Sequence, residues 1–432
     1  MQYKSVVTSF LTTEGKILLL RRSEKVGTHQ GKWSGVSGYL EGSEEPVQRA
    51  QTEIQEELDL TRDQIRLIRT GESLRAFDES TETVWVVHPF LFEANSKNLH
   101  LDWENSEYKW VDPDDLRTYQ TVPKLHETFD RVHCDLEKTP ALSNIFAKVE
   151  ELAQDRVHGA SYLGRKALEL LAAASVSQNP EDVTAENIFC TLLLVALRLR
   201  KAQPGMANVR NLVGNLLHQA DMKRDSAGTT SEFVSELRLI AEKLDERARS
   251  KSEDASRNAA AVLPDDGCVL THSYSTTVLR ALELGMKGGR RFQAYVTESY
   301  PGMEGKQLAK ALVQIGVPVK LVADSTVQTM ISDVNLVLLG ADSVLKDGSL
   351  LHKIGTRNIA SEANKRGIPL YAVCETLKFS TADFLGEPIQ ASETLFDVTA
   401  SRHVLKFITE DGPMEPRDVE GRIRLLLSEM YP

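Results

Sequence analysis

The spacing of apolar residues changes twice along this chain, and this change most limits the folds that it can adopt. Residues 1–137 carry short apolar runs typical of strands, with one clear helix. Residues 138–263 place apolar residues three and four positions apart, which predicts a helical bundle. Residues 264–432 alternate short apolar strands with helices, which predicts a Rossmann-like parallel sheet covered on both faces. Because 432 residues are too many for one ordinary core, we predict a multidomain α/β protein with these three regions as its domains.

The first region combines a predicted hairpin with a helix rich in glutamate. "SVVTSFL" and "KILLLRR" flank the turn "TTEG", and "ETVWVVHPFLFEA" predicts a further strand. Pro46 can begin the helix, in which Glu53, Glu56 and Glu57 follow at i, i+3 and i+4 and so share one face. The opposite face is apolar and comprises Val47, Ala50, Ile54 and Leu58. These carboxylates would repel each other unless a divalent cation bridged them, and hard oxygen ligands suit Mg²⁺ or Mn²⁺. A solvated acidic face is the alternative interpretation.

The spacing of these residues resembles the box of the Nudix hydrolases, G-x5-E-x7-R-E-U-x-E-E-x-G-U, in which U is apolar. The matching residues are Gly38, Glu44, Glu53, Ile54, Glu56, Glu57 and Leu60. The resemblance implies an α/β/α sandwich and hydrolysis of a diphosphate linked to another moiety. It assigns catalysis and metal binding to Glu53, Glu56 and Glu57, with the backbone carbonyl of Gly38 as a further metal ligand. Arg21 and Arg22 are candidate contacts to the substrate's phosphates.

Two positions depart from the box. Asp59 stands where the box has glycine, and aspartate can adopt the left-handed conformation at a helix end at modest cost. Thr52 stands where the box has an arginine that orients the glutamates, so one organising cation is missing. An inactive Nudix fold that serves as a recognition module is therefore an alternative to an active hydrolase.

From about residue 140 onwards, the chain resembles a second superfamily. "DRVHGASYLGRKALELL", "DGCVLTHSYSTTVLRAL" and "LVLLGADSVLKDGSLLHKIGT" are similar to the α, β and δ subunits of eukaryotic initiation factor 2B. They are equally similar to the isomerases of ribose 1,5-bisphosphate and methylthioribose 1-phosphate. These isomerases use a cysteine and an aspartate as acid–base partners and cationic residues to hold phosphate. The corresponding pocket residues of this chain are His158, Ser273, Asp342, Lys353 and Lys378.

Several of these positions differ from the isomerases. Ser273 replaces the cysteine, and a hydroxyl titrates far above a thiol, so it is a poor acid–base group. His158 and Gln203 replace arginines, which removes phosphate contacts. We therefore expect this half to act in assembly or in sensing a phosphorylated metabolite. The resemblance also implies a homodimer formed through the C-terminal domain.

Charge and composition argue against some classes of partner. The formal net charge of −11 argues against direct nucleic-acid binding, and no apolar run approaches the length of a membrane span. No signal-peptide pattern is present, so we expect a cytoplasmic protein, with a nuclear location as the alternative.

The combined prediction is a magnesium- or manganese-dependent Nudix pyrophosphohydrolase fused to an initiation-factor-2B-like domain. Its substrate would be a nucleoside diphosphate-linked or related phosphorylated metabolite. Two alternatives remain. One is a regulatory protein of translation initiation that binds initiation-factor subunits through a non-catalytic Nudix module. The other is a sugar-phosphate isomerase with an altered active site.

Overall fold

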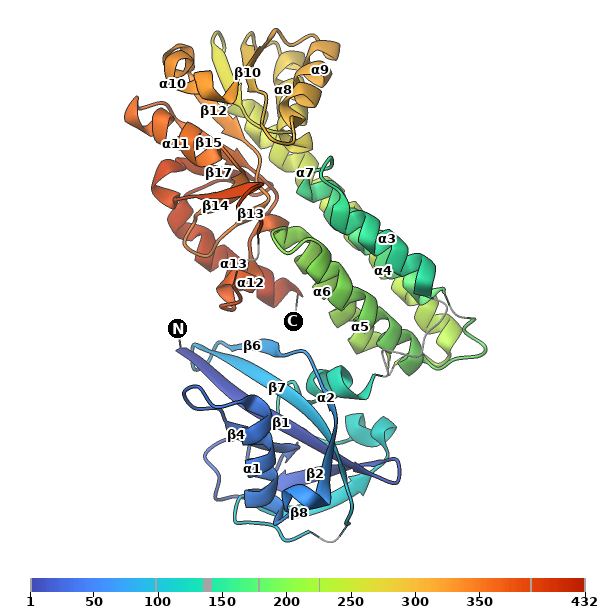
Figure 1. Ribbon diagram of the computed structural model, residues 1–432. Helices are drawn as coiled ribbons and strands as arrows, with labels where there is room; N and C mark the ends of the chain where they lie inside the picture. Colours follow the sequence, from blue (N-terminus) through green and yellow to red (C-terminus); the bar gives the residue numbers. More distant parts are fainter. Residues whose placement is uncertain are drawn as a thin grey trace. The chain divides into compact units, whose positions relative to one another are not determined.

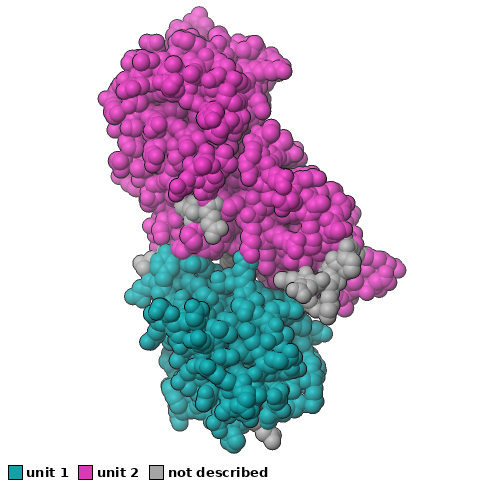
Figure 2. Space-filling view, viewed as in Figure 1, with its two compact units in different colours: residues 1–138 teal, residues 139–432 magenta. Residues whose placement is uncertain are grey.

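The computed structural model describes residues 2–97, 99–134, 142–177, 179–224, 226–388 and 391–430. The chain forms two compact units, residues 1–138 (unit 1) and 139–432 (unit 2), which Figure 2 distinguishes by colour. Both units mix helices and strands, which confirms the predicted α/β class. In the described part of the chain, none of the helices combines the length and the apolar character needed to cross a membrane.

An eight-stranded sheet forms the centre of unit 1 (Figure 1). Its main path is β3-β2-β1-β7-β5, while β4, β6 and β8 pair with β1, β7 and β2, respectively. The strands are β1 (Gln2–Thr13), β2 (Lys16–Arg22), β3 (Trp33–Ser34), β4 (Val36–Tyr39), β5 (Ile65–Thr70), β6 (Leu74–Asp78), β7 (Thr83–Ala94) and β8 (Asn105–Val111). The helices are α1 (Pro46–Leu58) and α2 (Leu125–His133). The predicted hairpin is confirmed: Glu14 and Gly15, both with positive φ, join β1 to β2 as in a two-residue hairpin turn.

The sheet of unit 1 lies between α1 and α2. Neighbouring residues of a strand point to opposite faces, so each strand contributes to two cores. Val7 of β1 packs in the cluster that contains Ile54 of α1. Phe10 packs edge-to-face on Phe129 of α2, with ring centroids 4.9 Å apart. This arrangement is the predicted α/β/α sandwich.

Unit 2 begins with five helices that lie side by side (Figure 1). They are α3 (Ser143–Gln154), α4 (Ala160–Ser175), α5 (Ala185–Ala202), α6 (Ala207–Arg224) and α7 (Thr230–Ala261). The last turns of α7 pack on the following α/β part, because Ala255 and Ala259 share a core with Val278. Through this contact, the helical part and the α/β part form one compact unit.

A seven-stranded sheet organises the rest of unit 2, in the order β11-β10-β9-β12-β15-β17-β18. The pairs from β11 to β17 are parallel, as predicted, and only β18 runs antiparallel. These strands are β9 (Cys268–Thr271), β10 (Gln293–Thr297), β11 (Val319–Val322), β12 (Leu336–Leu339), β15 (Leu370–Val373), β17 (Lys406–Thr409) and β18 (Gly412–Met414). A second sheet, β13-β14-β16, comprises Ser343–Val344, Leu350–Lys353 and Phe396–Thr399. The helices are α8 (Thr276–Lys287), α9 (Glu304–Gln314), α10 (Val327–Met330), α11 (Thr356–Lys365), α12 (Thr381–Phe384) and α13 (Val419–Met430).

Candidate functional site

Helix α1 presents the three predicted glutamates in unit 1. Pro46 is its first residue, and Asp59 ends it in the left-handed conformation with φ of 57°, as expected for a glycine substitute. The apolar stripe anchors the helix on the sheet, which turns the glutamate-bearing face towards β4 and the start of β8. Glu53 and Glu57 are 7% and 6% exposed, whereas Glu56 is open to solvent. A uniformly solvated acidic face does not describe this helix.

Glu57 is fixed by hydrogen bonds from two other elements. The backbone N–H of Ser37 donates to Oε1 at 3.0 Å, and Nδ2 of Asn105 donates to Oε2 at 2.7 Å. Burial nevertheless raises the pKa of Glu57 to about 8, because desolvation outweighs both hydrogen bonds. Sequence reasoning missed Asn105, which lies 48 positions from Glu57 and carries no local signal.

The loop before β8 brings Asn105 to this position. The N–H of Asp102 donates to the carbonyl of Glu57 at 3.1 Å, and the N–H of His100 donates to that of Leu58 at 3.3 Å. These bonds satisfy carbonyls at the end of α1 that have no partner within the helix. The same loop therefore caps the last carbonyls of α1 and delivers Asn105 to Glu57.

Glu53 packs against the backbone of Gly38 on β4. A Cβ atom at position 38 would overlap the Glu53 carboxylate, so only glycine leaves room for this approach. Arg49 forms an ion pair with Glu53 and a second one with Glu56, at 3.5 Å between Nη2 and Oε2. Burial raises the pKa of Glu53, although the charge of Arg49 opposes that rise. Sequence reasoning missed Arg49, although its i, i+4 spacing to Glu53 was a usable signal.

The other predicted residues of unit 1 have partners elsewhere. Arg21 pairs with Glu107 of β8 at 3.3 Å, and Nε of Arg22 donates to the carbonyl of Thr28 at 3.1 Å. Within the described residues, neither arginine contacts the glutamates of α1. Their predicted contact with substrate phosphate stays a prediction.

Two of the residues predicted to line a pocket in unit 2, Ser273 and Asp342, lie next to a reversal in strand order. The chain passes from β9 through β10 to β11 and then crosses back to β12 on the other side of β9. Open α/β sheets bind ligands at such a point, beyond the carboxyl ends of the strands. Ser273 follows β9 and Asp342 follows β12, so both lie at the same edge of the sheet, beyond the carboxyl ends of two adjacent parallel strands.

Asp342 is buried there, and its Oδ2 atom has no hydrogen-bond partner among the described residues. Burial raises the pKa of Asp342, while the charges of Lys353 and Lys378 oppose this rise. Ser273 has a φ of 65°, and its N–H donates to Oγ of Ser299 at 2.7 Å. Among the described residues, this carboxylate oxygen is therefore a buried acceptor without a donor.

Acidic residues neutralise the two predicted lysines. Lys353 lies 2.8 Å from Glu304, and Lys378 lies 3.7 Å from Glu375. Sequence reasoning missed both glutamates, whose pairing depends on the tertiary fold. His158 is exposed and stacks on Tyr162, with ring centroids 4.0 Å apart.

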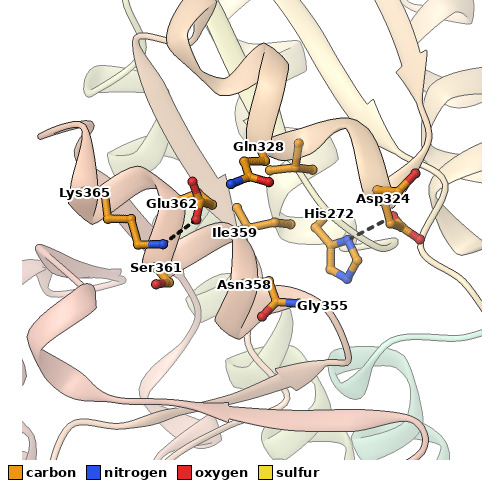
Figure 3. Close-up of a pocket in the computed structure, with 11 residues that line it drawn as sticks. His272, Asp324, Gln328, Gly355, Asn358, Ile359, Ser361, Glu362 and Lys365 are labelled. Carbon is orange, nitrogen blue, oxygen red and sulfur yellow. Dashed lines mark hydrogen bonds and ion pairs between the residues drawn. The ribbon is translucent and has the colours of Figure 1, made fainter.

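A pocket of about 340 Å³ opens beside His272, between α10 and α11 (Figure 3). Its polar lining residues include His272, Asp324, Gln328, Asn358, Ser361 and Lys365. Nε2 of His272 donates to the carbonyl of Ile354 at 2.9 Å, and Figure 3 shows Asp324 facing the other side of the ring. Sequence reasoning did not anticipate this pocket.

Comparison with known proteins accounts for both units. Residues 156–389, more than half of the chain, match the model of the Initiation factor 2 subunit family. The chain belongs to the initiation factor 2 subunit family. Residues 2–132 of this family member match the model of the NUDIX domain, so the resemblance seen in the box is confirmed.

Relatives of this initiation factor 2 subunit family member include enzymes and initiation factors. A ribose 1,5-bisphosphate isomerase of Haloferax volcanii is 28% identical over 325 residues, which cover 69% of this chain and 95% of the relative. The structure of the translation initiation factor eIF-2B of Pyrococcus horikoshii OT3 matches with a TM-score of 0.55 and 24% identity, over 64% of this chain and 99% of that one. The 5-methylthioribose 1-phosphate isomerase of the same organism matches with a TM-score of 0.52 and 22% identity, over 65% of this chain and 88% of that one. These two structural likenesses show the shared fold of unit 2.

Proposed function

We propose that unit 1 is a metal-dependent Nudix hydrolase that cleaves the diphosphate of a nucleoside diphosphate-linked or related phosphorylated metabolite. The observation that carries this proposal is the packing of the Glu53 carboxylate against Gly38, beside the buried Glu57. Arg49 compensates the charge of Glu53, whereas the described hydrogen-bond partners of Glu57 are neutral donors, and burying a carboxylate without a compensating charge is unfavourable. A function that requires both of them explains why the fold tolerates this arrangement.

The residues present fit a hard divalent cation such as Mg²⁺ or Mn²⁺. Glu53, Glu56 and Glu57 offer carboxylate oxygens, and Gly38 offers its backbone carbonyl without a side chain in the way. A cation bound there would neutralise charge on the diphosphate and lower the pKa of the attacking water. The raised pKa of Glu57 agrees with this fit, because a positive charge would stabilise its ionised form.

The three glutamates differ in whether they are suited to bind the cation or to remove a proton from water. Both oxygens of Glu57 accept hydrogen bonds, so this carboxylate is held in place as a ligand and faces away from bulk water. Glu56 is exposed to solvent and can accept a proton from water on one of its Oε atoms. We therefore assign binding to Glu53 and Glu57, and both binding and proton removal to Glu56.

The test is product release from a panel of nucleoside di- and triphosphates and nucleotide sugars, with Mg²⁺ or Mn²⁺. We expect turnover by the full chain and a loss of roughly 100-fold or more in Glu56→Gln and Glu57→Gln, because transition-state charge stabilisation is worth several kcal/mol. Glu79→Gln, which changes an exposed glutamate outside the box, is the matched control. Absence of turnover with every substrate and metal would instead favour a recognition module in translation initiation, as would co-purification with initiation-factor subunits.

For unit 2 we propose binding of a phosphorylated sugar or similar metabolite without isomerisation, within a homodimer formed by the C-terminal domain. The free Oδ2 atom of Asp342 supports ligand binding, because a ligand hydroxyl could donate to it. Ser273 in place of cysteine and the neutralised lysines argue against isomerase chemistry. The similarity to ribose 1,5-bisphosphate isomerases keeps isomerisation as the second candidate.

Ribose 1,5-bisphosphate separates these candidates for unit 2. We expect it to raise the melting temperature of the full chain without being converted, and we expect Asp342→Asn to abolish the shift. Conversion to a new product that disappears in Asp342→Asn would establish the isomerase instead. Light scattering of the purified chain tests the homodimer.

A further inference from the structure

We propose that Arg49 replaces the missing arginine of the Nudix box and acts as the positioning residue for Glu53 and Glu56. This inference rests on the proposed metal-dependent hydrolase. The box places its arginine directly before the first of its three clustered glutamates, which is Glu53 in this chain. Thr52 occupies the position of that arginine. Arg49 lies almost one turn earlier on α1 and contacts both carboxylates from there.

Helix geometry makes position 49 suitable for this task. With 3.6 residues per turn, Arg49 lies only about 40° around the helix axis from Glu53, on the turn that precedes it. Long helical side chains at i and i+4 meet on one face, so one guanidinium can contact two carboxylates. A single atom, Nη2 of Arg49, is shared between Glu53 and Glu56.

Thr52 cannot provide this contact. Its hydroxyl donates to the carbonyl of Gln48 at 3.0 Å, so the side chain bonds back to the backbone of its own helix. A threonine is also too short and carries no charge. Position 52, which the box uses to orient its glutamates, therefore does not orient them in this chain.

The surroundings of Arg49 show that its placement is specific. Its Nε atom is buried and has no hydrogen-bond partner among the described residues, so the side chain is partly desolvated. An exposed surface arginine would keep this donor in water. The ion pair with the buried Glu53 offsets the desolvation and holds that carboxylate against Gly38.

The experiment measures Mn²⁺ affinity by calorimetry on the full chain, alongside thermal unfolding without metal. Removing a group that orients metal ligands typically weakens binding 10- to 100-fold, so we expect a loss of roughly this size in Arg49→Ala. We expect Thr52→Arg to restore most of the affinity when it is added to Arg49→Ala, because it returns the cation to the position used by the box. Arg49→Lys, which keeps the charge without the guanidinium, should give an intermediate affinity. The control is Arg66→Ala, which removes another arginine–glutamate pair, with Glu93, away from α1.

Each outcome decides the proposal. Unchanged or tighter Mn²⁺ binding in Arg49→Ala would show that the arginine blocks the site or is irrelevant to it, while the hydrolase proposal would stand. A loss that Thr52→Arg does not rescue would overturn the replacement of the box arginine. Should Arg49→Ala unfold, the comparison of Arg49→Lys with the unchanged chain decides instead, and equal affinity would overturn the specific role of the guanidinium. Absence of Mn²⁺ binding by the unchanged chain would overturn both proposals.

Discussion

Gly38 decides, at the scale of single residues, whether Glu53 can lie against the sheet. We predict that Gly38→Ala weakens Mn²⁺ binding by roughly 10- to 100-fold, because its Cβ atom would displace the Glu53 carboxylate. The core of unit 1 does not include this contact, so the unfolding temperature should change little. Calorimetric titration and thermal unfolding of the same variant measure the two effects.

Gly27→Ala is the control for this substitution. Nothing lies within 4 Å of a Cβ atom at position 27, so this variant should bind Mn²⁺ like the unchanged chain. Equal affinities for the two alanine variants and the unchanged chain would show that Glu53 does not need to approach Gly38.

Two buried histidines of unit 2 are held in the neutral form. The hydroxyl of Thr356 donates to the carbonyl of Lys353, so Nδ1 of His352 donates to that hydroxyl oxygen at 3.0 Å. Nε2 of His272 donates to the carbonyl of Ile354, and its Nδ1 accepts from Thr297. Burial lowers the pKa of both rings from the ordinary value of 6.5.

These lowered pKa values predict acid sensitivity. Below pH 6.5 the unfolded chain binds protons on these histidines while the folded chain does not, so the free energy of unfolding falls with decreasing pH. The slope is at most about 1.4 kcal/mol per pH unit for each histidine. His352→Asn should therefore reduce the slope by up to this amount, as measured by urea unfolding between pH 7.5 and 5. An unchanged slope in this variant would contradict a neutral, buried His352.

At the scale of elements, alanine substitutions at two helical glycines of unit 2 should change the free energy of unfolding in opposite directions. A Cβ atom at Gly305 of α9 would overlap the carbonyl oxygen of Thr297, so Gly305→Ala should lower the free energy of unfolding by about 1–3 kcal/mol or more. Gly421 of α13 faces open space, so Gly421→Ala should raise it by roughly 0.5–1 kcal/mol through helix propensity. Urea unfolding followed by circular dichroism measures both changes. The packing of α9 on β10 would be contradicted if Gly305→Ala also stabilised the chain.

The elements differ in how far the sequence predicts them. The hairpin β1–β2, α1 and the parallel strands carry local patterns that indicate their conformation directly. The sheet β13-β14-β16 was not predicted, because its strands are only two to four residues long and β16 pairs with β14 from a distant part of the sequence. Its hydrogen bonds are set by the tertiary fold, which periodicity does not report.

The same distinction holds within the candidate sites. The spacing of Glu53, Glu56 and Glu57 on one helix follows from helical geometry and was predicted. Asn105 and Glu304 come from distant elements, so their pairing with Glu57 and Lys353 depends on the whole fold. A local pattern therefore predicts the charged group, whereas its partner becomes visible only in the structure.

At the scale of the whole molecule, the unfolding of unit 1 can be followed separately within the full chain by tryptophan fluorescence. All four tryptophans, Trp33, Trp85, Trp103 and Trp110, lie in unit 1. Mg²⁺ at 100 times its dissociation constant should stabilise the unit that binds it by about 2.7 kcal/mol. We predict that it raises the unfolding temperature seen by tryptophan fluorescence and that Glu57→Gln removes this shift. The same rise in Glu57→Gln would place the cation elsewhere.

The central claim is that the carboxylates of Glu53, Glu56 and Glu57 together bind a divalent cation that serves diphosphate hydrolysis. Calorimetric titration of the full chain with Mn²⁺, with and without a non-hydrolysable nucleoside diphosphate analogue, tests this claim most directly. The account predicts saturable binding that tightens with the analogue and is lost when all three glutamates are changed to glutamine. Absence of saturable binding by the unchanged chain, or equal binding by the triple variant, would contradict it.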